Sequence, residues 1–227
     1  MKLKVSAAAL AVAASLALTA PASAQTTFKF LNGGTVTAFG FYVGPYNGLM
    51  GDPPTPVVLN CVDFFHDVVN NEVWTANLTN LGTGIGVGSV TRNSSLQLYQ
   101  EAAWLTTQYP TNPTTTAQRQ TVADIQATMW DLFPIPSGYS APPTPTSSYW
   151  LGQAQANYGS IDYSNFWVVT AVNKDDPASA QEFIMRTTTT PEPSTIVLLL
   201  TGLGLVGLVA WRRRERAAAL QPADALA

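Results

Sequence analysis

An uncharged run near the C-terminal end constrains the fold of this chain more than any other feature. Residues 196–210 contain no charged side chain and are mostly Ile, Val, Leu and Gly. As a helix, the segment from Thr195 to Trp211 would be about 26 Å long at ~1.5 Å per residue, enough to cross a slightly thinned bilayer. A basic cluster follows it: Arg212, Arg213, Arg214 and Arg216. Because basic residues stay in the cytoplasm, we expect a transmembrane helix over 194–211, a stop signal in these arginines and a cytoplasmic tail over 212–227.

A short polar motif stands directly before this run. Pro191, Glu192 and Pro193 precede Ser194, and the apolar segment then begins. The motif, the apolar span and the arginine cluster together resemble the PEP-CTERM sorting signal. The resemblance implies that Pro191, Glu192 and Pro193 are recognised by exosortase, a membrane protease-transpeptidase of bacteria that make extracellular polysaccharide. The alternative is an ordinary single-pass membrane anchor.

The N-terminal end predicts a secretory signal peptide over residues 1–24. Lys2 and Lys4 precede an apolar stretch over 5–18, and Ala22-Ser23-Ala24 offers the small residues of a cleavage site. The exported domain then covers 25–186 and is long enough for one hydrophobic core. We expect a linker carrying the PEP motif over 187–193, and we place the exported domain on the non-cytoplasmic side, anchored or released to the surface or matrix after processing.

The exported part of the chain is acidic. Residues 25–190 contain eleven Asp or Glu and five Lys or Arg, a net charge of −6. Nucleic acid binding needs a basic surface, so nucleic acid is excluded as a partner. The chain also lacks a Gly-rich phosphate loop, a serine nucleophile elbow and zinc-ligand spacing. We therefore expect no metal, no cofactor and no enzyme activity.

Periodicity predicts a mainly β fold with a helical insertion. Short β-branched or aromatic runs bounded by Gly, Asn or Pro indicate strands at 28–31, 35–43, 57–64, 73–78, 166–172 and 182–186. Apolar residues at helical spacing indicate helices near 95–109 and 116–132, stopped by Pro110 and Pro134. Strands, then helices, then strands favour a β-sandwich or barrel of the α+β class.

Cys61 is the single cysteine of the chain. An exported protein with one cysteine cannot form an internal disulfide, and an exposed thiol would be open to oxidation. Three interpretations remain: a buried cysteine that packs as a small hydrophobe, a disulfide to another molecule, or chemical masking of the thiol.

A second motif bears on the masking of the thiol. In Ile125-Gln126-Ala127-Thr128-Met129-Trp130, Gln stands four residues before Trp on a predicted helix. Three features together resemble the thioester domains of bacterial surface adhesins: a cysteine in an early strand, a helix of the Ala103-Trp104-Leu105…Tyr109-Pro110 kind, and this later helix with its Gln and Trp. The resemblance implies that Cys61 and Gln126 form an internal thioester with loss of ammonia, and that a surface nucleophile opens it and becomes covalently attached.

Other residues offer alternative functions. Cys61 and His66 suggest a cysteine hydrolase. However, if Cys61 to Phe65 is a strand, alternation puts His66 on the opposite face. Asp63, His66 and Asp67 suggest either a metal site or an exposed acidic turn, which we favour.

Three aromatic residues have two possible roles: Tyr139, Tyr149 and Trp150. Their rings are suited either to stacking on sugars or to covering the edge of the hydrophobic core, and we favour the second role. The sequence thus favours an exported structural or adhesive protein at the cell surface or in a polysaccharide matrix such as a biofilm. The resemblance to thioester domains implies in addition that Cys61 and Gln126 would be its attachment site. The alternative is a non-covalent carbohydrate-binding module.

Overall fold

The computed structural model describes residues 25–85, 90–187 and the single residue Gly202. The chain divides into two units, 1–188 and 189–227, and the fold below belongs to the first. The predicted signal peptide, the PEP motif and the basic tail lie outside the described residues, as does the predicted transmembrane helix apart from Gly202. In the described part of the chain, no helix has the length and apolar character needed to span a bilayer.

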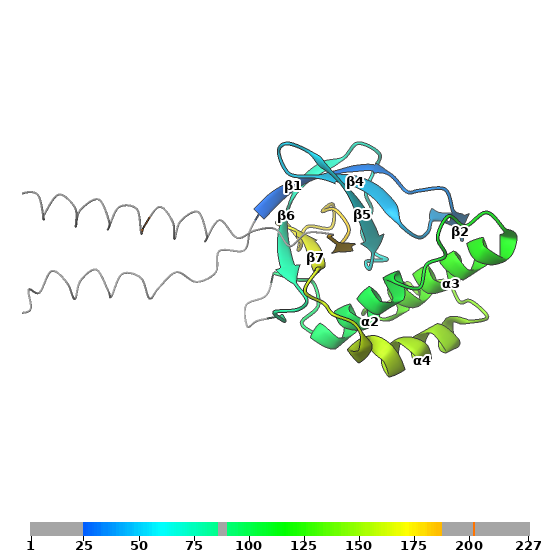
Figure 1. Ribbon diagram of the computed structural model, residues 1–227. Helices are drawn as coiled ribbons and strands as arrows, with labels where there is room; N and C mark the ends of the chain where they lie inside the picture. The colour runs from blue at the N-terminus through cyan, green and yellow to red at the C-terminus, as the bar shows by residue number, and fades with distance from the viewer. Residues whose placement is uncertain (1–24, 86–89, 188–201, 203–227) are drawn as a thin grey trace, which may run out of the picture. The chain divides into compact units, whose positions relative to one another are not determined.

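Six antiparallel strands form a closed barrel in the order β1-β4-β5-β8-β7-β6 (Figure 1). These strands are β1 (Gln25–Asn32), β4 (Tyr46–Met50), β5 (Thr55–Cys61), β6 (Val73–Asn80), β7 (Phe166–Ala171) and β8 (Phe183–Arg186). β1 shows the alternation behind this arrangement: Phe28 and Phe30 are buried, whereas Lys29 between them is not. Because the barrel is closed, its six strands leave no open sheet edge.

Three helices are inserted between β6 and β7: α2 (Leu96–Thr106), α3 (Thr116–Asp131) and α4 (Ser147–Asn157), followed by the 3₁₀ turn η1 (Tyr158–Ser160). Local capping fixes where the first two begin. The Ser95 side chain accepts from the Leu98 amide, and Thr115 forms a reciprocal capping box with Gln118. The predicted mainly β fold with a helical insertion is thus confirmed, with a barrel as its β part.

The helices lie together at one end of the barrel (Figure 1), and two apolar clusters explain why. One cluster fills the barrel and includes Val122, Ala123 and Trp130 from α3. The other lies between the helices and the outer face of the barrel and includes Ile125 and Met129 of the same helix. α3 is therefore apolar on two sides, and one of these sides closes the end of the barrel. The buried residues of both clusters lie between Phe28 and Met185, within the first of the two units.

One predicted strand was wrong, and two elements were not predicted. The predicted strand 35–43 instead turns back on itself at Phe39 and Gly40, both with positive φ, to pair β2 (Thr37–Ala38) with β3 (Phe41–Tyr42). β4 was not predicted because it contains Asn47 and Gly48. The strand is tightly packed at Gly48, where a Cβ would lie 2.9 Å from a Leu59 methyl group and 3.1 Å from the Lys29 carbonyl oxygen. α4 was also missed, and Ala154 is its one fully buried residue among those described.

Candidate functional site

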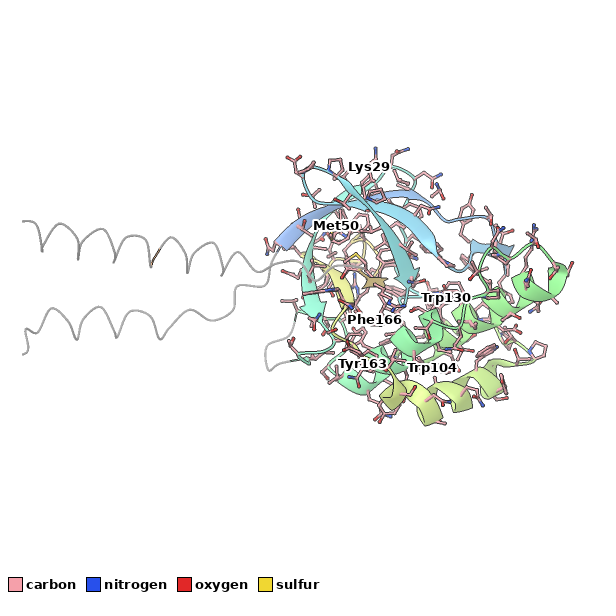
Figure 2. The ribbon with its side chains drawn as sticks, in the orientation of Figure 1. Lys29, Met50, Trp104, Trp130, Tyr163 and Phe166 are labelled. Carbon is pink, nitrogen blue, oxygen red and sulfur yellow. The ribbon has the colours of Figure 1, made fainter. Side chains whose placement is uncertain are left out.

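Gln126 is fully buried on α3, with an exposed fraction of 0%. It lies on the side of the helix that carries Ala123 and Trp130, both members of the barrel cluster. Figure 2 labels Trp130 where α3 meets the end of the barrel. Ile125 and Met129 lie on another side of the helix, in the cluster between the helices and the barrel. A glutamine facing a closed apolar barrel must find partners inside it, because burying an unpaired amide is costly.

Cys61 is the last residue of β5 and is also fully buried. Its thiol donates to the Asp63 carbonyl oxygen, with an Sγ–O distance of 3.1 Å. The Trp130 indole donates to Sγ from Nε1 at 3.4 Å. Burial raises the pKa of Cys61 to about 12, the nearby Asp63 carboxylate adds to the rise, and these two hydrogen bonds oppose it. At neutral pH the group is therefore a shielded thiol.

The structure brings Cys61 and Gln126 into direct contact although 65 positions separate them. Gln126 Nε2 donates to the Cys61 carbonyl oxygen at 2.8 Å. The carbonyl end of the same amide accepts two hydrogen bonds: Tyr109 Oη donates to Oε1 at 3.0 Å and the Gly44 amide at 3.3 Å. The carboxamide is therefore held at both ends beside the cysteine.

The two donors to Oε1 were not identified from the sequence as site residues. Tyr109 lies beyond the C-terminal end of α2 at Thr106, although the helical periodicity had included it in that helix. Gly44 has φ +95°, and a Cβ there would lie 2.6 Å from Val122 Cγ1. A glycine is therefore required at this position, but nothing in the local sequence relates it to α3.

Aromatic rings cover this site on the side of the β2–β3 hairpin. The Phe64 and Trp130 centroids are 5.0 Å apart, and Phe41 packs edge-on against both at 5.6 and 6.1 Å. Trp130 itself is buried, whereas Phe41 is exposed. A cavity of about 190 Å³ opens beside these rings, with Tyr42 and Asp67 also in its lining. We call Phe41, Phe64 and Trp130 the aromatic cover.

His66 belongs to an ionic cluster rather than to the thiol. β5 ends at Cys61, so the assumption of a strand from 61 to 65 was wrong. His66 Nδ1 lies 2.7 Å from an Asp63 carboxylate oxygen, and the same oxygen lies 3.0 Å from Arg92 Nε. Arg92 also approaches His66 Nε2 at 3.3 Å. Both ring nitrogens of His66 thus have partners other than Cys61 Sγ.

The acidic turn around His66 does not gather metal ligands in the described residues. No group of three His, Cys, Asp or Glu side chains suited to a metal ion occurs there. Asp63 is nearly buried in its ionic contacts, while Asp67 is exposed. The prediction of an exposed acidic turn is therefore wrong for Asp63, which is nearly buried.

A second buried polar network was not predicted. The Glu182 carboxylate accepts from Tyr99 Oη at 2.5 Å, from Thr170 Oγ1 at 2.6 Å and from the Arg92 amide at 2.8 Å. Burial raises the pKa of Glu182 above its ordinary value. Because these partners come from β7, α2 and the segment before α2, the network links α2 to the barrel.

Tyr139, Tyr149 and Trp150 differ in how far they are exposed to solvent. Tyr139 and Tyr149 are 61% and 57% exposed. Trp150 packs against the cluster between the helices and the barrel. Trp150 therefore covers the edge of the core, whereas Tyr139 and Tyr149 expose their rings to solvent.

Residues 189–214 match the PEP-CTERM protein-sorting motif. The match includes Pro191, Glu192 and Pro193 together with Arg212, Arg213 and Arg214. Comparisons with curated proteins and with solved structures gave no significant match. The matched motif implies export and processing by exosortase and the membrane secretion machinery. The chain thus carries a PEP-CTERM sorting motif, and this motif supports an exported, exosortase-sorted surface protein.

Proposed function

We propose that the exported domain attaches covalently to surface or matrix molecules through an internal thioester between Cys61 and Gln126. One observation carries this proposal: a cysteine and a glutamine, far apart in sequence, are both fully buried and in contact. The lone cysteine of an exported chain then has a use that burial alone does not give it. The sorting motif supports this role because it implies export to where such targets lie.

Thioester formation uses only groups present at the site. Cys61 Sγ bonds to the carboxamide carbon of Gln126, and the carbon–nitrogen bond breaks. The thiol proton joins the nitrogen, which leaves as ammonia. In the second step a nucleophile bonds to the same carbon, the carbon–sulfur bond breaks, and the proton of the nucleophile passes to sulfur.

The surroundings of the pair suit a stored reactive bond. A thioester lasts only where water is excluded, and the aromatic cover packs over the buried thiol. The adjoining cavity gives a target nucleophile a place to approach from the side of the hairpin. The final product is an amide or ester link between Gln126 and the target.

A second candidate function is non-covalent carbohydrate binding. Tyr139 and Tyr149 are the most exposed aromatic side chains in the described residues, and Tyr42 is 49% exposed. Exposed tyrosine rings are suited to stacking on sugars. This function needs no chemistry at Cys61.

The test is covalent capture of a small amine. The exported domain, residues 25–188, is incubated with a fluorescent primary amine and run on a denaturing gel. We expect the wild type to keep the label and Cys61→Ala to keep none. If the wild type carries no label after denaturation, the proposal is wrong. Equal binding of extracellular polysaccharide by wild type and Cys61→Ala would instead favour the carbohydrate-binding module.

A further inference from the structure

The carbonyl oxygen of Gln126 lies between two hydrogen-bond donors from different parts of the chain. Tyr109 Oη reaches it from the segment between α2 and α3 at 3.0 Å. The Gly44 amide reaches it from the segment between β3 and β4 at 3.3 Å. Gln126 Nε2 is separately held by the Cys61 carbonyl oxygen. The orientation of the carboxamide is therefore set by hydrogen bonds at both of its ends.

We propose that Gly44 N–H and Tyr109 O–H form an oxyanion hole that promotes the making and the opening of the thioester. This inference rests on the proposed function. When Cys61 Sγ attacks, the carbonyl carbon becomes tetrahedral and negative charge develops on Oε1. The same charge develops on the same oxygen when a nucleophile attacks the thioester, so the two donors act in both steps.

The positions of both donors are fixed before reaction. Gly44 is buried, and its positive φ, with Val122 close behind, holds its amide toward α3. Burial raises the pKa of Tyr109 well above its ordinary value, so the phenol keeps the proton it donates. Donors placed in advance in a dry site need no reorganisation as charge develops, and this is the source of their effect.

The site offers a matched control residue. Tyr46 is buried in the barrel cluster, and its hydroxyl donates to the Tyr42 carbonyl oxygen at 2.8 Å. Tyr109→Phe and Tyr46→Phe each remove one hydroxyl that donates a hydrogen bond, but the Tyr46 hydroxyl bonds to a backbone carbonyl instead of Gln126.

The experiment measures two quantities by intact mass on residues 25–188. One is the fraction of chains that lack one ammonia at a fixed time after synthesis, and the other is the rate of opening by methylamine. We expect Tyr109→Phe to slow opening by about 10²–10³, the usual effect of losing one oxyanion-hole donor, and to lower the fraction formed. Tyr46→Phe should open at close to the wild-type rate.

Comparable rates for Tyr109→Phe and the wild type would overturn the oxyanion hole and leave the thioester standing. A wild type that never loses ammonia would overturn the thioester and this inference with it. If Tyr109→Phe does not fold, replacement of Tyr109 by fluorotyrosine keeps the hydroxyl and makes it a stronger donor. We then expect faster opening, and an unchanged or slower rate would contradict the inference.

Discussion

Removal of the buried Gln126 side chain should destabilise the domain strongly. Gln126→Ala leaves the Cys61 carbonyl, the Gly44 amide and the Tyr109 hydroxyl without the partner each has in the structure. An unsatisfied buried polar group costs about 1–3 kcal/mol. Water can enter the vacated space, which is lined by these polar groups, and recover part of this loss. We therefore expect a loss of about 3–6 kcal/mol in the free energy of unfolding.

The measurement must separate these hydrogen bonds from any covalent link. We therefore compare Cys61→Ala with the double variant Cys61→Ala/Gln126→Ala, because neither can form a thioester and the backbone carbonyl at position 61 is kept. Urea unfolding of residues 25–188, followed by tryptophan fluorescence, gives the free energy of each. The control is Gln155→Ala in the same background, the same substitution at an exposed position of α4, expected within about 0.5 kcal/mol.

A difference below about 1 kcal/mol between the two Cys61→Ala proteins would refute the reasoning. The Gln126 amide would then contribute no more than one ordinary hydrogen bond, and the buried arrangement beside Cys61 would be wrong. A large loss in the Gln155→Ala control would show that α4 tolerates change poorly, and would remove the contrast between buried and exposed positions.

Three further predictions test the packing, a buried charge and the cover of the site. Leu59→Ala should cost about 2–5 kcal/mol by urea unfolding because Leu59 is fully buried, whereas Val58→Ala, next to it and 47% exposed, should cost far less. Because the folded-state pKa of Glu182 is raised, the folded protein keeps a proton that the unfolded chain has lost at pH values just above the ordinary Glu pKa. Stability should therefore fall as pH rises through that window, and Glu182→Gln should flatten this slope in unfolding measured over a pH series. Phe41→Ala opens the aromatic cover, so we expect thioester hydrolysis, followed by intact mass, to be several-fold faster than in the wild type, and an equal rate would exclude a shielding role.

Much of the architecture could be predicted from local patterns. The two helices α2 and α3 have apolar spacing and capping residues, and both signals act within a few positions along the chain. α4 has neither: Thr146 makes no side-chain capping bond, and its buried surface is small. The β2–β3 hairpin was mistaken for one strand because its turn depends on a positive φ at Phe39, a residue that seldom adopts it.

The residues of the candidate site also fall into two groups, those that a local motif indicated and those that only the fold brings together. Cys61 and Gln126 could be named because a short motif suggested a pairing, and the barrel then places them together. The hydrogen bonds of Gly44 and Tyr109 to Gln126 could not be predicted, because each residue meets Gln126 only through the closure of the barrel by α3. The local sequence around Tyr109 indicated a helix face, and that around Gly44 indicated nothing about Gln126.

The most direct test of the Cys61–Gln126 account is the intact mass of residues 25–188, purified without reductant, beside the mass of Cys61→Ala. The account predicts that the wild type is lighter than its calculated mass by one ammonia and has no titratable thiol, and that the variant has its full calculated mass. A wild type of full mass with one titratable thiol after denaturation would contradict the account and return Cys61 to the role of a packed core residue.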